Sequence, residues 1–436
     1  MKKSLTLLLS ILLLSFHAVS QEWIPIFSGN PEAAAITVSP VAFSGSNVQI
    51  SLPGFHRTGD NKPEGFSGKV LMQEGVNEIE AGKPDLQHLT ISLSLPGRGN
   101  AVLNIVRSEF TEYKDYFIHP VKDDPGIKNK ENRRNSKANA GIYKRDEFYP
   151  GTLASAGRPY IWCDTRGVAV QVYPLQYNPV TGALRVYHFI EFEIVTLDEP
   201  GINELTRLSP DFNSLSGMRT AIAGHFTNGT DNSRYTPVEE AGNMLIIAPA
   251  SYFETLKPFT TWKAQAGISC EVVDVAAFSK ADNLRQFVAE YYYSKGLTYL
   301  LLAGDVQQVP TLQAETGASD NMYGYIAGDD HYPEILTGRF PADNQAQLKV
   351  MIDRSISYEK EGRGNAAYSS FLGIASELGP GDDGESDFQH IRNIGKQLLD
   401  YNYSRFNEMY DGSQGENDAE GNPVASGVTA ALHQGQ

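Results

Sequence analysis

The residues best suited to chemistry are acidic side chains that follow apolar segments in the second half of the chain. Asp305 comes directly after one such segment, and Asp330 and Glu334 lie in the next polar stretch. Alternate residues of an extended segment share one side, and calcium takes six to eight hard oxygens from carboxylates, carbonyls and water. These three carboxylates therefore form a candidate calcium cage, and a solvated acidic loop is the alternative. The carbonyl ligands of the cage would come from Ala327 and Tyr332.

A second group of acids follows another apolar segment. Glu377 comes after Ala375-Ser376, and Asp387 opens the helix expected beyond it. Helix N-termini favour acids through capping and the helix dipole, so capping alone explains Asp387. A carboxylate at the exit of a buried strand is where a catalytic histidine can be oriented. Glu377 is therefore a candidate for the supporting acid of a catalytic site.

These acids need a framework that brings strand ends together. Continuous apolar runs alternate with helical patterns throughout the second half of the chain. The expected strands are residues 243–249, 271–275, 299–303 and 371–375, and the expected helices are residues 253–266, 284–295, 345–360 and 387–401. Alternation of this kind predicts a mainly parallel α/β sheet. Ligands of such sheets collect beyond the carboxyl ends of the strands.

The residues before about 199 have a different pattern. Apolar and polar residues alternate in segments such as 48–52, 89–93 and 168–172, which is the period of half-buried strands. Asn178-Pro179-Val180-Thr181-Gly182 predicts a hairpin turn. We expect an antiparallel β-sandwich, with the polar and charged residues 122–140 as an exposed, cleavable loop between its halves.

The N-terminus is typical of a secretory signal peptide. Lys2 and Lys3 precede an apolar run over residues 5–16, and small residues lead up to a cleavage point between Ser20 and Gln21. The run is shorter than the roughly 20 apolar residues that a membrane-spanning helix needs. No other segment is apolar enough to cross a bilayer, so we expect a secreted protein.

The charge distribution separates the two regions. Residues 235–436 hold 28 of the 52 acidic residues but only 13 of the 36 basic ones. Nucleic acid is excluded as a partner because its binding needs a basic footprint. An acidic region instead suits bound cations or cationic substrates.

Cys163 and Cys270 are the only cysteines, too few for a disulfide framework. Cys270 lies in an apolar strand pattern without a neighbouring histidine, and Cys163 follows Trp162 in a β-rich stretch. We expect both to be packed thiols rather than nucleophiles.

Two features of the sequence resemble the gingipains, secreted bacterial cysteine peptidases of family C25. One is the border between the two regions, and the other is the set of acidic blocks that follows it. Arg234-Tyr235-Thr236-Pro237-Val238-Glu239-Glu240 is similar to a gingipain maturation junction. Residues 299–310, 320–340 and 374–390 resemble consecutive blocks of the peptidase, and residues 177–187 resemble its pro-region. The resemblance implies a β-sandwich propeptide over residues 21–234, after a signal peptide at 1–20. Residues 235–436 would then be the N-terminal part of a caspase-like α/β peptidase domain.

The resemblance also implies roles for single residues. Glu377 matches the acid behind the catalytic histidine, and Asp387 matches the carboxylate on the floor of the S1 pocket that receives an arginine side chain. Glu385 is a weaker match to a ligand of a second cation. The matches to a structural calcium site are Asp305, Ala327, Asp330, Tyr332 and Glu334.

The protein implied by this resemblance is the precursor of a calcium-stabilised cysteine endopeptidase that cleaves proteins or peptides after basic residues. Activation would follow cleavage between Arg234 and Tyr235, and because an enzyme that prefers arginine can make that cut itself, arginine is favoured over lysine. The pro-domain would act as an intramolecular inhibitor. The expected location is the extracellular space or the outer-membrane surface of a Gram-negative bacterium.

One departure from the family concerns catalysis. The family's histidine lies in a Thr-Gly-His-Gly-like block with the nucleophilic cysteine further on, and neither is in this sequence; His433 lacks the flanking glycines. We therefore expect this chain alone to be inactive and to stop inside the peptidase domain.

Two alternative functions remain open at this point. A sortase-like member of the family would join secreted cargo to the outer-membrane surface rather than digest it, and it needs the same missing cysteine. A non-catalytic propeptide or binding module would use the β-sandwich itself. The junction at Arg234 favours a zymogen over the sortase-like enzyme.

Overall fold

The computed structural model describes residues 22–27, 34–41, 45–78, 80–121, 139–206, 216–229, 242–315, 317–361, 366–379 and 385–433. The predicted signal peptide with its cleavage point at Ser20 and Gln21 lies outside these residues. So do Arg234 and Tyr235 of the predicted junction and most of the predicted cleavable loop. Those predictions stay predictions.

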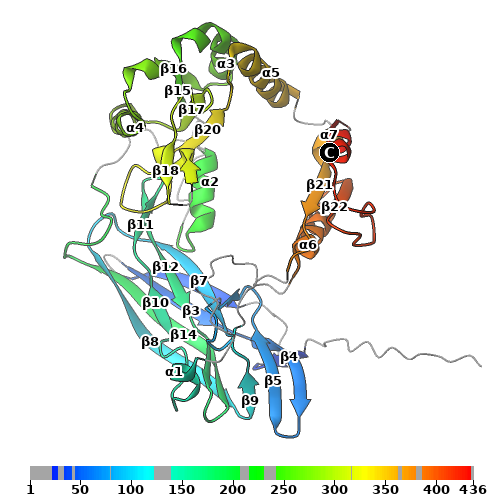
Figure 1. Ribbon diagram of the computed structural model, residues 1–436. Coiled ribbons are helices and arrows are strands. Elements are labelled where there is room, and N and C mark those ends of the chain that lie inside the picture. Colours follow the sequence, from blue (N-terminus) through cyan, green and yellow to red (C-terminus); the bar gives the residue numbers. More distant parts are fainter. Residues whose placement is uncertain are drawn as a thin grey trace, which may run out of the picture.

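Alternating apolar residues fold the first part of the chain into an all-β structure (Figure 1). Its strands are β1 (Glu22–Pro25), β2 (Ala35–Val41), β3 (Gly45–Ser51), β4 (Gly54–Lys62), β5 (Gly65–Leu71), β6 (Val76–Asn77), β7 (Gln87–Ser94), β8 (Asn100–Tyr113), β9 (Tyr116–Ile118), β10 (Ala154–Ala156), β11 (Tyr160–Trp162), β12 (Thr165–Val172), β13 (Leu175–Asn178) and β14 (Ala183–Leu197). Two helices accompany them, α1 (Ala140–Tyr143) and α2 (Ser216–His225).

These strands form three sheets around one apolar core. The sheet orders are β1-β4-β5-β9, β10-β12-β7-β6 and β13-β14-β3-β2, with β11 also paired to β12 and β8 to β14. The strand pairs are antiparallel, apart from the parallel pair β5 and β9. Inward residues of β3, β7, β12 and β14 alternate with exposed ones and share a single core. The predicted β-sandwich is confirmed.

The second part of the chain alternates strands and helices, as predicted. Its strands are β15 (Asn243–Ala248), β16 (Ser269–Asp274), β17 (Tyr299–Ala303), β18 (Leu312–Ala314), β19 (Gly317–Ser319) and β20 (Leu336–Phe340). Its helices are η3 (Ala250–Tyr252), α3 (Phe253–Gln265), η4 (Val275–Ala277), α4 (Ala281–Lys295), η5 (Asp320–Tyr323) and α5 (Gln345–Glu361). The order β16-β15-β17-β20 makes a parallel sheet.

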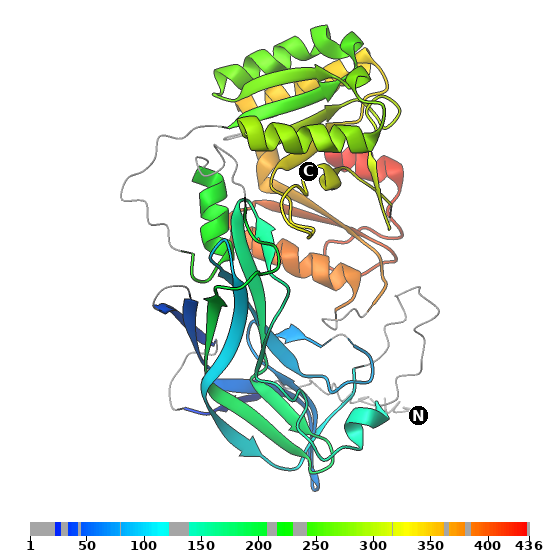
Figure 2. The same cartoon turned by 90° about the vertical axis from the view of Figure 1, so that its left-hand side faces the viewer.

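Both faces of this parallel sheet are covered. Leu245 and Ile247 of β15 point to a core shared with α4, whereas Met244 and Ile246 point to a core shared with α3 and α5. A strand buried on both faces requires a continuous apolar run, which is why the sequence shows this strand so clearly. Figure 2 shows this α/β layer above the β-sandwich.

The last described elements form a smaller unit. They are η6 (Ala366–Ser369), β21 (Ser370–Ala375), α6 (Asp387–Asp400), β22 (Arg405–Tyr410) and α7 (Ala425–His433). Strands β21 and β22 pair in parallel, and α6 packs on both of them. The sequence predicts one parallel sheet for this region, but the structure has a four-stranded and a separate two-stranded sheet. Gly395 lets α6 approach β22 closely, because a Cβ there would lie 2.3 Å from the Phe406 ring.

A hairpin joins the β-sandwich to the α/β layer. The turn between β11 and β12 consists of Cys163 and Asp164, both with positive φ (52° and 53°). Cys163 is buried in the same core as α4 and β17, with Trp162 packed beside it. The two parts of the chain therefore share apolar surface that neither would bury alone.

Both cysteines are reduced in the structure, Cys163 buried and Cys270 half-buried. Burial raises the pKa of the Cys163 thiol and of the Cys270 thiol. A nucleophilic cysteine needs the opposite shift, so the prediction of packed thiols is confirmed. Separately, no helix in the described parts of the chain is both long and apolar enough to span a membrane.

Candidate functional site

Asp305 leaves β17 at the carboxyl end of the four-stranded sheet, where the sequence places it. Gly304, with φ at +146°, turns the chain there, a conformation that favours glycine. The Gly304 N–H donates to the Phe340 carbonyl (2.9 Å), and the Asp305 N–H donates to the Ala342 carbonyl (3.1 Å). The backbone of this turn is therefore fixed to the chain that leaves β20.

Arg339 of β20 also holds the turn that carries Asp305 in place. Its Nε and Nη2 atoms donate to the two carboxylate oxygens of Asp320 (2.7 Å each), and its Nη1 atom donates to the carbonyls of Gly304 and Val309 (2.8 Å each). Burial alone would raise the pKa of Asp320, but hydrogen bonds, chiefly from Arg339, outweigh it and the net pKa is lowered. Arg339 thus positions the segment that carries Asp305.

Replacement of Arg339 by methionine is expected to destabilise the chain by about 2–3 kcal/mol at pH 7, because it strips a carboxylate and two carbonyls of their donor. Asp320 has a lowered pKa in the fold, so its contribution is present above its unfolded pKa and lost as the pH falls through the folded value. Urea unfolding at pH 7 and pH 3 should show a deficit that shrinks in acid. Lys349→Met, which removes an exposed ion pair with Asp353, is the matched control.

Glu334 is the buried centre of the predicted calcium loop. Its side chain is 0% exposed, and its Oε2 atom accepts the N–H groups of Ile326 (2.8 Å) and Ala327 (2.9 Å). Its Oε1 atom is buried and accepts no hydrogen bond from the described residues. Burial, helped by the charges of Asp330 and Asp164, raises the pKa of Glu334 to about 8. A buried carboxylate oxygen that lacks a donor fits a hard cation as its partner.

Asp330 lies four residues earlier in the same loop, half-buried. Its Oδ1 atom accepts the Tyr332 N–H (3.0 Å), and its Oδ2 atom accepts the Ile161 N–H (2.8 Å) and Asn203 Nδ2 (3.2 Å). Within the described ranges, no group of three or more Asp, Glu, His or Cys side chains is arranged to hold a metal ion. The structure thus places Asp330 and Glu334 in one loop without gathering Asp305 into a cage, and the calcium role stays a prediction.

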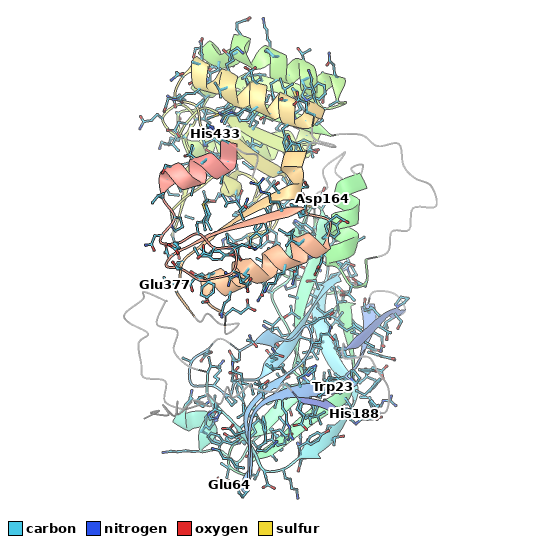
Figure 3. All side chains as sticks on the ribbon, turned by 90° about the vertical axis from the view of Figure 1, so that its right-hand side faces the viewer. Trp23, Glu64, Asp164, His188, Glu377 and His433 are labelled. Carbon is cyan, nitrogen blue, oxygen red and sulfur yellow. The ribbon has the colours of Figure 1, made fainter. Side chains whose placement is uncertain are left out.

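Glu377 and Asp387 lie at the end of the two-stranded sheet. The parallel register pairs Ala375 with Tyr410, so the carboxyl ends of β21 and β22 are neighbours. Glu377 is exposed, and its Oε2 atom lies 3.3 Å from where a Cβ on Gly412 would be. Figure 3 shows Glu377 in this unit and Asp164 at the hairpin below the other sheet.

Asp387 is exposed in the first turn of α6. The Ser376 hydroxyl donates a short hydrogen bond to Asp387 Oδ2 and accepts the Leu378 N–H (3.1 Å). At the helix end itself, the Ser386 N–H is satisfied by the Gln389 side chain (2.9 Å). Asp387 is therefore held at the strand end by Ser376, which goes beyond the helix-capping explanation.

Glu385 makes local contacts on α6. Its two carboxylate oxygens accept Asn393 Nδ2 (2.7 Å) and contact His390 Nδ1 (3.3 Å). Its weaker assignment to a second cation therefore stays a prediction.

Several residues that organise these sites were not predicted from the sequence. Ser376 and Arg339 are single polar residues in or beside strands. Asn203 binds Asp330 across 127 positions. Such partners are specified by the path of the folded chain and leave no short-range pattern in the sequence. No local signal could therefore have identified them.

Comparison with known proteins agrees with the predicted resemblance. Residues 238–436 match the model of Peptidase family C25, and residues 27–206 match that of Propeptide_C25. Gingipain R2 of Porphyromonas gingivalis is 35% identical over 396 residues, which cover 88% of this chain and 52% of that protein. Lys-gingipain of the same species is 28% identical over 236 residues, covering 51% of this chain and 13% of that protein.

Among solved structures, the complex of Porphyromonas gingivalis RgpB pro- and mature domains aligns with a TM-score of 0.38 and 29% identity, covering 46% of this chain and all of that chain. The chain spans about half the length of Gingipain R2 (52%) and 37% of Gingipain R1. The two family models together account for nearly all of the β-sandwich and the α/β region. Residues 238–436 of the chain thus match peptidase family C25, and residues 27–206 ahead of them match the propeptide of that family.

Proposed function

We propose that this chain is part of the zymogen of a secreted cysteine endopeptidase that cleaves after basic residues, with arginine preferred. The observation that carries this proposal is the rim formed by Glu377 and the Ser376–Asp387 pair at the ends of two parallel strands. An exposed carboxylate fixed in this way suits a guanidinium, which pairs with both carboxylate oxygens at once. The longer and stronger match to Gingipain R2 than to Lys-gingipain favours arginine.

In such an enzyme, different residues have separate roles in catalysis and in substrate binding. A cysteine thiolate attacks the carbonyl that follows the basic residue, and a histidine moves the proton. Of the residues in this chain, Glu377 would accept a hydrogen bond from that histidine and keep it in the useful tautomer. Asp387 would bind the substrate side chain and so orient the scissile bond.

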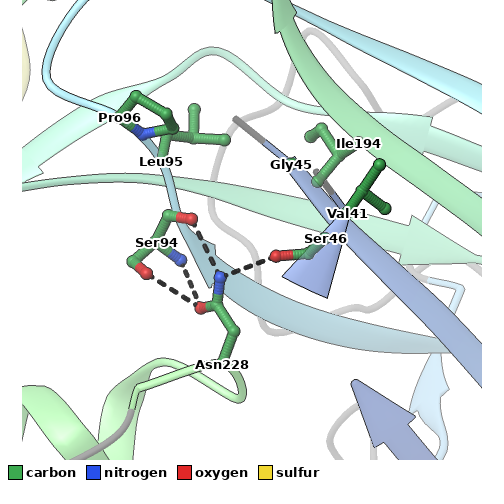
Figure 4. Close-up of a pocket in the computed structure, with 8 residues that line it drawn as sticks. All are labelled: Val41, Gly45, Ser46, Ser94, Leu95, Pro96, Ile194 and Asn228. Atoms are coloured by element: carbon green, nitrogen blue, oxygen red, sulfur yellow. Dashed lines mark hydrogen bonds between the residues drawn. The ribbon is translucent and has the colours of Figure 1, made fainter. Parts of the chain in front are cut away.

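We also propose that residues 21–234 form the inhibitory pro-domain and are released by cleavage after Arg234. The contacts of Asn228 support a boundary beyond residue 229 (Figure 4). The Asn228 Oδ1 atom accepts hydrogen bonds from the N–H (2.7 Å) and the hydroxyl (3.0 Å) of Ser94. Its Nδ2 atom donates to Ser46 Oγ and to the Ser94 carbonyl (3.0 Å each). Phe226 beside it is buried against Tyr160. The segment after α2 is thus fastened to the sandwich, while β15 at Asn243 already belongs to the α/β sheet.

Calcium is the cation proposed for the loop of Asp330 and Glu334, with Asp305 and the carbonyls of Ala327 and Tyr332 as further ligands. The support is the buried Oε1 atom of Glu334. When bound, the ion would supply positive charge that stabilises the ionised carboxylate and would link the stability of the loop to free calcium.

Replacement of Asp387 by asparagine in the full-length protein is expected to lower kcat/KM for arginine substrates by roughly 100-fold, as expected when one partner of a desolvated charge pair is lost. Substrates with an uncharged residue in place of arginine should be much less affected. Asp400→Asn, at the other end of α6, is the matched control. Equal losses on charged and uncharged substrates would reject Asp387 as the specificity residue.

A further inference from the structure

The hydroxyl of Ser376 joins the end of β21 to the start of α6. Its Oγ atom accepts the Leu378 N–H (3.1 Å) and donates to Asp387 Oδ2. The Asp387 N–H donates to the Leu378 carbonyl (2.9 Å), so backbone and side chains close the same ring of hydrogen bonds. Residues 376–379 and 385–387, which meet in this way, are called the two arms below.

The two arms approach each other so closely that no side chain fits at Gly379. A Cβ there would lie 2.5 Å from Ser386 Cα, and φ of Gly379 is +133°, a conformation that favours glycine. On the other arm, the Ser386 N–H donates to the Gln389 side chain (2.9 Å) in the first turn of α6. The backbone from which the Asp387 side chain projects is therefore fixed on both sides.

The single proton of the Ser376 hydroxyl is directed at Asp387. A serine oxygen can accept and donate at once, and here it accepts the Leu378 N–H, which leaves its proton for Asp387 Oδ2. Among the residues that the structure describes, Ser376 alone donates a hydrogen bond to the Asp387 carboxylate. The last torsion of an aspartate side chain is otherwise broad. This one hydrogen bond therefore sets the plane in which the two carboxylate oxygens lie.

The plane of a carboxylate matters more to one kind of cation than to another. A guanidinium is a rigid, planar fork that pairs with both carboxylate oxygens, whereas an ammonium is a compact charge with three rotatable donors. A carboxylate that turns freely therefore serves an ammonium better than it serves a guanidinium. We propose that Ser376 is a specificity-determining residue, which favours arginine over lysine by holding the Asp387 carboxylate in one plane.

Charge alone does not account for such a preference. The carboxylate attracts both cations, and the hydrogen bond from Ser376 weakens that attraction for both alike, because it draws on the same negative charge. The hydrogen bond occupies one of about four lone-pair positions of the carboxylate, so both oxygens can still accept from a guanidinium. Loss of the hydroxyl thus removes the alignment that arginine needs and leaves the attraction that lysine uses. The inference rests on the proposed function and deepens it.

The test uses the activated full-length enzyme and peptide substrates that differ only in arginine or lysine before the scissile bond. Ser376→Ala should lower the ratio of kcat/KM for arginine to kcat/KM for lysine at least about fivefold, because one charge-assisted hydrogen bond of the fork is misaligned. Ser376→Thr keeps the hydroxyl on an extended backbone and should hold the ratio within about twofold of the unmodified enzyme. Ser404→Ala is the matched control, since that hydroxyl bonds Ser369 at the opposite end of β21 and β22.

Reversible inhibitors give a readout that does not depend on turnover. Benzamidine carries a planar amidinium and butylamine an ammonium, so Ser376→Ala should weaken inhibition by benzamidine relative to butylamine. Equal changes for arginine and lysine substrates, or for the two inhibitors, would overturn the role of Ser376 and leave the proposed function standing. An unmodified enzyme that cleaves after lysine as fast as after arginine would reject the arginine preference, and the inference with it.

Discussion

Replacement of Glu334 by glutamine is expected to flatten the pH dependence of stability of the metal-free protein between about pH 5 and pH 8. Burial raises the pKa of Glu334 to about 8, whereas an unfolded glutamate has a pKa of about 4.3. Between these values the folded state holds a proton that the unfolded state has released, so stability falls as the pH rises. One pKa unit corresponds to about 1.4 kcal/mol, and the loss is on the order of 4–5 kcal/mol. Glutamine does not titrate, so the Glu334→Gln variant should not show this loss of stability.

Thermal unfolding with a chelator and with excess calcium distinguishes the causes. Calcium should restore the stability of the unmodified chain at pH 8, because the cation favours the ionised carboxylate, and should do less for Glu334→Gln. Glu254→Gln, which changes an exposed glutamate with a side chain 81% exposed, controls for the loss of one charge. A stability that stays level from pH 5 to pH 8 in the unmodified, metal-free chain would show that Glu334 titrates normally.

Replacement of Arg392 by methionine is expected to cost about 3–5 kcal/mol of stability, as in other cases where one partner of a buried ion pair is removed. Arg392 Nε lies 2.7 Å from Glu408 Oε1, and Nη2 lies 3.3 Å from Oε2. Glu408 is only 4% exposed, so the variant would leave a buried carboxylate without its counter-charge. The hydrogen bond to Glu408 stabilises the charged form of Arg392 and so raises the pKa of Arg392.

The double variant Arg392→Met with Glu408→Leu separates loss of the pair from loss of packing. Removing both charges should recover much of the stability, and urea denaturation of the two variants measures the difference. Lys257→Met, which breaks an exposed pair with Glu254, should cost less than about 1 kcal/mol. If the double variant is no more stable than the single one, the effect lies in packing of α6 against β22.

The sequence predicted those elements whose burial is complete on both faces. The run from Asn243 became β15, and the run from Tyr299 became β17, because strands in the middle of a parallel sheet contain apolar residues at every position. Strands β20 and β22 were not predicted. Arg339 interrupts the first and Glu408 the second, and each is accommodated only through a partner from another element, Asp320 or Arg392.

The residues alone predicted the change from β-sandwich to α/β layer and the strand ends that carry Asp305 and Glu377. They also showed the resemblance to a peptidase family. Local patterns hold this information because burial repeats with the period of each element. The tertiary structure alone decided that Ser376 fixes Asp387, and that Asp330 binds Asn203 from the sandwich. Polar partners of this kind are chosen by where the folded backbone brings distant segments together, and the spacing of residues along the chain carries no record of that choice.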